Sequence, residues 1–218
     1  MEFNILTERQ AAFLQNFEKD KFLTKDFYLT GGTALAEFYL GHRLSGDLDF
    51  FSEEEFDLLA LNVFLKKAKG VLGFTRVDFQ KSNNRNLYFL HFDDEVLKIE
   101  FTFFPFPRIE KGEIKNGVQV DSFLDIAVNK LFTIYQRTQA RDFVDLYFIF
   151  RKGDLVMEDL VSKARAKFDW HIDPLQLGTQ FSKVTEAKDY PRMIMELPEG
   201  WQDFFTKEAR KFKNSIIS

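Results

Sequence analysis

Two aspartates at alternate positions are candidates for metal binding. Residues 47–51 read Asp47-Leu48-Asp49-Phe50-Phe51, in which acidic and apolar side chains alternate with the period of a β-strand. In a strand, Asp47 and Asp49 point to one face, about 6.6 Å apart along the chain, while Leu48 and Phe50 point into the core. Such oxygen ligands suit Mg²⁺ or Mn²⁺. The spacing therefore indicates a divalent-metal site, with two surface acids on a solvated strand edge as the alternative.

Glu100 is the candidate for a third carboxylate. It belongs to the alternating segment 96–102, in which Lys98, Glu100 and Thr102 share one face. If this strand is the neighbour of the strand at 47–51, the three acids converge. Three acids together with substrate phosphates could hold two metal ions about 3.5–4 Å apart for phosphoryl or nucleotidyl transfer.

A pair of glycines precedes the aspartates. Gly31 and Gly32 follow a short predicted strand at 27–30, and Thr33 is the predicted N-cap of a helix that ends at Gly41. The backbone N–H groups of such a turn, at the start of a helix, can receive phosphate oxygens. A turn with no ligand is the alternative.

A second polar group lies in the later part of the chain. Lys130 and Arg137 are seven residues apart, so they share one face of a predicted helix and could hold a triphosphate or an RNA backbone. Asp142 and Asp145 share a face of the next helix, where Arg141 could pair with Asp145. The alternatives are a solvated helix face for the basic pair, and a helix-dipole contact with a surface ion pair for the acids.

The elements that must position these residues fall into two parts. The predicted strands are 27–30, 47–51, 74–80, 86–92 and 96–104, and the predicted helices are 9–17, 33–41, 56–69, 124–135, 140–151, 157–168 and 200–213. Two prolines and two glycines in 105–117 indicate a boundary. The sequence therefore predicts an α/β domain over 1–117 and a helical domain over 118–218.

Composition excludes several classes of protein. The 30 Lys and Arg against 34 Asp and Glu give a net charge of −4, which disfavours broad, sequence-blind binding to nucleic acid. The absence of cysteine excludes disulfides, thiolate zinc sites and cysteine nucleophiles. The first ten residues have neither a basic region nor a long apolar run, and no later stretch reaches the roughly 18 apolar residues of a membrane span. We expect a cytoplasmic protein with no membrane segment.

Two blocks of residues resemble a known family. The run Gly31-Gly32-Thr33-Ala34-Leu35-Ala36, followed by His42-Arg43-Leu44-Ser45-Gly46-Asp47-Leu48-Asp49-Phe50-Phe51, resembles the first motif of the AbiEii/AbiGii toxin-like nucleotidyltransferases. These are a branch of the polymerase-β-like nucleotidyltransferase superfamily. Asp125-Ile126-Ala127, Lys130-Leu131, Arg137 and Arg141-Asp142-Phe143-Val144-Asp145-Leu146-Tyr147 resemble the family's later lysine and acidic motifs. The resemblance covers roughly residues 28–150.

The resemblance implies a fold and a reaction. The fold is a nucleotidyltransferase-like α/β (α+β) domain with a mixed sheet, followed by a mostly α-helical domain. The reaction moves a nucleoside monophosphate from a nucleoside triphosphate (NTP) to an acceptor hydroxyl, with Mg²⁺ or Mn²⁺ at Asp47 and Asp49. Glu100 is assigned as the third metal ligand by its strand position. Lys130 would steady the triphosphate. The other residues implied in nucleotide binding are Gly31, Gly32, Thr33, Arg43, Ser45, Arg137, Asp142 and Asp145.

The resemblance also implies partners. They are an RNA acceptor of the tRNA-like kind and a separately encoded antitoxin, in a bacterial toxin-antitoxin or abortive-infection (phage-defence) system. Protein nucleotidylation, phosphotransfer on the same scaffold, and a non-catalytic nucleotide-binding regulator are the alternatives.

Overall fold

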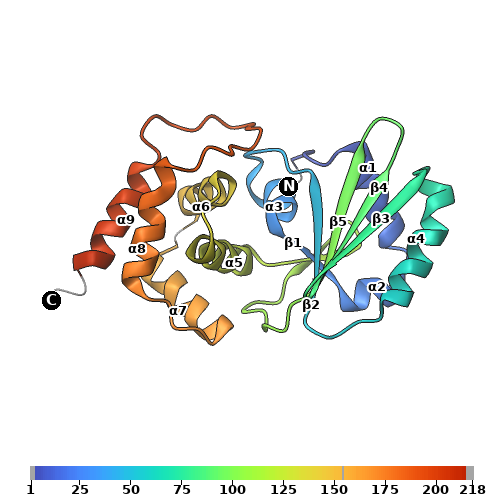
Figure 1. Cartoon of the computed structure of the whole chain (residues 1–218), viewed down its shortest axis with the longest axis horizontal. Coiled ribbons are helices and arrows are strands. Elements are labelled where there is room, and N and C mark those ends of the chain that lie inside the picture. The colour runs from blue at the N-terminus through green and yellow to red at the C-terminus, as the bar shows by residue number, and fades with distance from the viewer. Residues whose placement is uncertain (1–2, 154, 215–218) are drawn as a thin grey trace. The chain divides into compact units, whose positions relative to one another are not determined.

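The computed structural model describes residues 3–153 and 155–214. They cluster into two compact units (Figure 1). Unit 1 contains Met1–Tyr39, Leu44–Pro107 and Lys111–Ser122, and unit 2 contains Leu40–Arg43, Arg108–Glu110 and Phe123–Ser218. The domain boundary at Gly117 stays a prediction.

Unit 1 is built on one mixed sheet of seven strands in the order β3-β4-β5-β2-β1-β7-β6. The pairs β2/β5 and β1/β7 are parallel, and the other neighbours are antiparallel. The strands are β1 Tyr28–Thr30, β2 Asp47–Ser52, β3 Arg76–Ser82, β4 Arg85–His91, β5 Val96–Phe103, β6 Glu113–Lys115 and β7 Val118–Val120. The helices of this unit are α1 Glu8–Phe17, α2 Lys21–Asp26, α3 Gly31–Leu35 and α4 Leu58–Leu72.

Phenylalanine rings form the core on one face of this sheet. Phe50 of β2 and Phe101 of β5 are fully buried, with ring centroids 5.1 Å apart. Phe17 of α1 lies 4.5 Å from Phe50, and Phe64 of α4 meets Phe17 edge to face. Helices α1 and α4 therefore cover the face to which the apolar residues of β2 and β5 point. The opposite face carries the acids.

The predicted strands and the first helix are present, with ends shifted by a few residues. The helix after the glycines differs from the prediction: it begins at Gly31, its N-cap is Thr30, and Thr33 lies inside it. It continues as a π-helix over Ala36–Leu40. Three short elements were not predicted: α2, with six residues, and β6 and β7, with three residues each.

Unit 2 is helical after residue 122, as predicted for the C-terminal part. Its helices are α5 Phe123–Gln136, α6 Ala140–Lys152, α7 Met157–Phe168, α8 Pro174–Ser182 and α9 Asp203–Asn214. Helix α8 was not predicted, although Asp173 caps it and Pro174 opens it. Phe143, Phe181 and Phe205 are fully buried between α6, α8 and α9. Among the described residues, no helix is long and apolar enough to cross a membrane.

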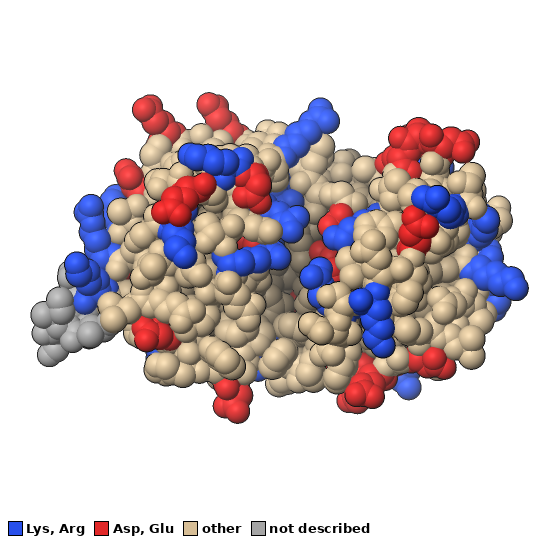
Figure 2. Space-filling model, viewed as in Figure 1, with Lys and Arg blue, Asp and Glu red and all other residues tan. Residues whose placement is uncertain are grey.

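Both signs of charge are present on the surface. Figure 2 shows Lys and Arg side chains interspersed with Asp and Glu on the face in view. This mixture agrees with the small net charge of −4.

Candidate active site

The three candidate carboxylates come from adjacent strands of unit 1. Strands β2 and β5 are parallel neighbours, and their register pairs Asp47 with Lys98 and Asp49 with Glu100. Burial alternates along β2, with Asp47 and Asp49 half-buried while Leu48 and Phe50 are fully buried. The strand pairing on which the convergence of the acids depended is therefore present.

Asp47 and Glu100 each have a cationic partner. Lys98 Nζ lies 2.5 Å from Asp47 Oδ2. Arg85 of β4 donates two hydrogen bonds of 2.6 Å to Glu100, and Thr102 Oγ1 donates a third of 2.7 Å. Burial raises the pKa of Glu100, but these hydrogen bonds and the charge of Arg85 lower it by more. The net pKa of Glu100 is therefore below its usual value. Glu100 is therefore a carboxylate at neutral pH.

The donor set fits a hard cation in its chemistry. All three acids offer oxygen, and Lys98 and Arg85 already place positive charge against them. Among the described residues, no three acidic or histidine side chains lie close enough together to hold a metal ion as they stand. Asp47 and Asp49 are the accessible pair, whereas Glu100 would have to exchange Arg85 for the ion.

Gly31 is required by the close approach of Asp49. Its φ is +73°, and a Cβ built on it would lie 2.4 Å from Asp49 Oδ2. Any side chain there would displace the carboxylate, in addition to the strain of a left-handed backbone. The structure therefore brings the glycine and aspartate motifs together.

The remaining candidates of unit 1 are held around this pair. The Thr33 hydroxyl donates to the backbone carbonyl of Asp47. Ser45 is half-buried, and its carbonyl accepts a 2.9 Å hydrogen bond from Gln10 Nε2. Gly32 is buried in the first turn of α3. Together these contacts fix the strand end that carries Asp47.

The candidates of unit 2 form one buried ionic network. Asp145 accepts from Arg43 Nε at 2.6 Å and from Arg43 Nη2 at 2.8 Å, and Lys130 Nζ lies 2.7 Å from its Oδ2. Lys130 also donates to Asp142 at 2.9 Å, and Arg137 Nη2 lies 3.1 Å from Asp142. The alternative from the sequence gave Lys130 and Arg137 a solvated helix face and put Asp145 in a surface ion pair. It is wrong for Asp145, which is fully buried, and for Lys130, whose side chain is 12% exposed, but not for Arg137.

The opposite charges in this network stabilise each other's ionised form. Burial raises the pKa of Asp145, but the charges of Arg43 and Lys130 lower it well below the usual range. Burial likewise lowers the pKa of Lys130, but Asp145 and Asp142 raise it above its usual value. Three cations face two carboxylates, so one positive charge remains. Arg137, with 44% of its side chain exposed, is the member that solvent reaches most easily.

Three contacts around these sites were not predicted from the sequence. His42 is fully buried, and its Nε2 lies 2.7 Å from Asp145 Oδ1. Arg85 pairs with Glu100, a contact that alternation along β4 and β5 could have suggested. Asp125 forms a fully buried pair with Lys167 at 2.6 Å, and no local pattern relates residues 42 apart.

A mixed sheet carrying an Asp-x-Asp strand beside a helix that starts with glycines, followed by a helical part, defines a nucleotidyltransferase fold. The model of the family "Nucleotidyl transferase AbiEii toxin, Type IV TA system" matches residues 12–213. The chain therefore belongs to the AbiEii nucleotidyltransferase toxin family, and it is a nucleotidyltransferase. Membership implies an NTP substrate and an antitoxin.

One further relative is similar in sequence, and two solved structures are similar in fold. The protein aq_aa25 of Aquifex aeolicus is 33% identical over 197 residues, covering 87% of this chain and 89% of its own. JHP933 of Helicobacter pylori has the same fold, with a TM-score of 0.61 at 21% identity over 96% of this chain and 90% of that one. A second Helicobacter pylori structure gives a TM-score of 0.62 at 20% identity over 97% of both chains.

Proposed function

We propose that this enzyme transfers a nucleoside monophosphate from an NTP to a hydroxyl group of RNA. A bond forms between the acceptor oxygen and the α-phosphorus while the bond from the α-phosphorus to the bridging oxygen breaks. Pyrophosphate leaves with that electron pair, and the proton of the hydroxyl passes to a base or to water. The observation that carries the proposal is the register that sets Asp49 beside Glu100 and Asp47 on the same strand face.

In this proposal the carboxylates of unit 1 bind Mg²⁺ or Mn²⁺. Such an ion, when bound, neutralises phosphate charge and lowers the pKa of a bound hydroxyl. Asp47 and Asp49 would be its main ligands, because both are half-buried and therefore reachable from solvent. The lowered pKa of Glu100 suits a ligand better than a proton acceptor at neutral pH. Arg85 and Lys98 would balance the acids before the ion arrives.

The remaining residues would serve the triphosphate. Gly31 and Gly32 begin α3, where the first backbone N–H groups of a helix have no intrahelical partner. Thr33 and Ser45 would hold this backbone in place. We assign Arg43, Lys130 and Arg137 to the negative charge of the substrate. Asp142 and Asp145 would act by positioning those cations through the contacts described above.

Transfer of label tests the reaction and the acceptor together. The protein is incubated with Mg²⁺ and each α-³²P-labelled NTP, once with total RNA and once with total protein. We expect label in RNA, and at least a hundredfold less in Asp49→Asn, the size of loss that follows removal of one preorganised charge at a reacting centre. Label in protein alone would show protein nucleotidylation, and nucleotide binding without label would show a regulator. Either result contradicts the proposal.

A matched control is available on the same face of the sheet. Asp78 of β3 has 46% of its side chain exposed and pairs with Arg76 and His91. Asp78→Asn should keep normal transfer, since the proposal gives this carboxylate no role. Equal loss in Asp78→Asn and Asp49→Asn would point to a general effect of negative charge. Full activity of Asp49→Asn would remove the metal site.

A further inference from the structure

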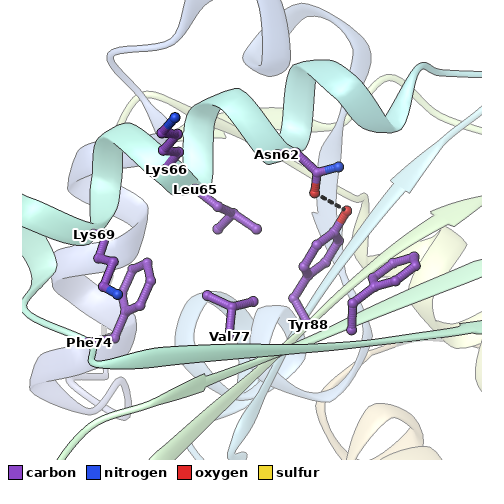
Figure 3. A pocket seen from close by; sticks show the side chains of 8 residues that line it. Asn62, Leu65, Lys66, Lys69, Phe74, Val77 and Tyr88 are labelled. Atoms are coloured by element: carbon purple, nitrogen blue, oxygen red, sulfur yellow. Dashed lines mark hydrogen bonds between the residues drawn. The ribbon is translucent and has the colours of Figure 1, made fainter.

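A pocket lies on the face of the sheet opposite the acids. It is formed between α4 and strands β3 and β4 and has a volume of about 320 Å³ (Figure 3). Leu65, Phe74 and Tyr88 form an apolar floor and are nearly fully buried. The Tyr88 hydroxyl donates to Asn62 Oδ1 at 3.2 Å, so the polar end of this ring already has a partner. The pocket uses none of the residues of the candidate active site.

One wall of the pocket is the edge of the sheet. Strand β3 is the terminal strand, and within the described residues it pairs with β4 alone. Every second residue of an edge strand turns its N–H and C=O away from its neighbour, which leaves them available to another strand. Val77 and Phe79 line the pocket, and 46% of Phe79 is exposed. Alternation places Lys81 on the same face.

Positive charge surrounds the apolar floor. Of the eight residues that line the pocket, Lys66 and Lys69 are charged, and none of the other six is acidic or basic. Within the part of the chain that the structure describes, neither lysine makes an ion pair with a carboxylate. Lys81, on the same face of β3 two residues beyond Phe79, adds a third cation along this edge. The complementary ligand is an apolar side chain flanked by acidic ones.

We propose that β3 is a docking edge for an extended, acidic segment of a partner protein. The segment would add a strand to β3, insert one apolar side chain against Phe79 and Leu65, and place carboxylates near Lys66 and Lys69. In strand addition, main-chain hydrogen bonds supply affinity and pockets for alternate side chains supply specificity. This edge and this pocket provide both in one place. The inference does not depend on the proposed reaction.

The test uses a defined peptide rather than an unknown partner. The probe is the acetylated, amidated peptide TETLTET, in which leucine and both glutamates share one strand face. Titrated into the ¹⁵N-labelled full chain, it should shift the NMR signals of Val77 to Lys81 and of the pocket residues. A peptide with N-methyl groups on the amides that would pair with β3 should bind about tenfold more weakly, because each methyl group removes a ladder hydrogen bond.

Charge reversal gives an independent measure. The double variant Lys66→Glu, Lys69→Glu should bind TETLTET about tenfold more weakly and should prefer the peptide TKTLTKT. The matched control is Lys163→Glu, Lys207→Glu, which reverses two exposed lysines of α7 and α9 and should bind as the parent does. Thermal melts verify that each variant is folded.

Three results would overturn the proposal. The first is no shift in β3 with TETLTET at millimolar concentration. The second is equal binding of the N-methylated peptide, which would mean that side chains alone dock. The third is a set of pocket shifts produced by phenylacetate, with none along the β3 edge from the peptide. That pattern would identify a small-molecule site.

Discussion

At the scale of single residues, Gly31 and Asp49 are fitted to each other. A Cβ at Gly31 would lie 2.4 Å from Asp49 Oδ2 and 3.3 Å from Asp49 Cβ, so the aspartate would have to move. Gly31 also has a φ of +73°, which costs other residues roughly 1–2 kcal/mol. We expect Gly31→Ala to lower the free energy of unfolding by about 2 kcal/mol and to abolish nucleotidyl transfer.

Gly46 is the matched control for this prediction. It immediately precedes Asp47, and a Cβ built there meets nothing within 4 Å. Gly46→Ala should change the free energy of unfolding by less than about 0.5 kcal/mol and leave transfer intact. Urea titrations and the transfer assay on both variants measure this. If Gly31→Ala retains parental activity, the close approach has no role in positioning Asp49.

Lys130 tests the buried network. Only 12% of its side chain is exposed, and Nζ contacts both Asp142 and Asp145. Removing one partner of a buried pair leaves uncompensated charge and typically costs about 3–5 kcal/mol. We expect a loss of this size in Lys130→Ala by urea unfolding. Lys163→Ala, an exposed lysine on α7, should lose less than about 0.5 kcal/mol. A loss below 1 kcal/mol in Lys130→Ala would mean that Arg43 and Arg137 suffice.

At the scale of elements, the sheet and its first helix depend on phenylalanine packing. Phe17 of α1 is fully buried and contacts the rings of Phe13, Phe50, Phe64 and Phe101. Truncation of a buried phenylalanine costs about 3–5 kcal/mol. Phe17→Ala should lose that amount in denaturant unfolding, whereas Phe22→Ala, with 65% exposure on α2, should lose less than about 0.5 kcal/mol. Similar losses in both would contradict the assignment of the core.

Periodicity predicted the elements that carry most of the site. The strict alternation of residues 47–51 and 96–102 gave both the strands and the face on which the acids lie. Pairing between β2 and β5 could only be stated as a condition, because Asp49 and its register partner Glu100 are 51 positions apart, with two other strands between them in the chain. The short β6 and β7 were missed, since three residues carry too little alternation to recognise.

The buried ionic network was beyond sequence reasoning for a physical reason. Lys130 lies on the polar side of α5 in a helical projection, and Arg137 follows the last residue of that helix, so both are predicted to be exposed. Lys130 is nevertheless largely buried, because it packs against Asp142 and Asp145 of α6, and Asp145 in turn pairs with Arg43, 102 residues away in the chain. Charged residues are buried only when paired, and pairing across such distances leaves no local pattern. The family motif identified these positions without revealing their contacts.

At the scale of the whole molecule, stability should depend on acid pH. Glu100, Asp125, Asp142 and Asp145 each have a pKa below the usual value, because their cationic partners outweigh the effect of burial. As the pH falls, these carboxylates therefore take up protons near pH 4 in the unfolded chain, but only at lower pH in the folded one. Stability from these pairs is complete above that pH and is lost as the pH falls through the lowered folded-state pKa values. Urea midpoints measured from pH 7 to pH 3 should fall most steeply below about pH 4.

His42 should add an earlier step to this decline. Burial lowers its pKa, and Arg43 and Lys130 lower it further, against the opposing effect of Asp145. Its Nδ1 is buried and has no hydrogen-bond partner among the described residues, so a second proton there would gain no acceptor. The unfolded histidine takes up a proton near pH 6.5 while the folded one stays neutral, so stability falls with pH from about 6.5 downward. The slope can reach about 1.4 kcal/mol per pH unit for one proton.

His42→Gln removes the titrating group, and its urea midpoint should be flat between pH 7 and pH 5 where that of the parent falls. Parallel curves for the two proteins would show that His42 is protonated in the folded state, as the imidazolium partner of Asp145.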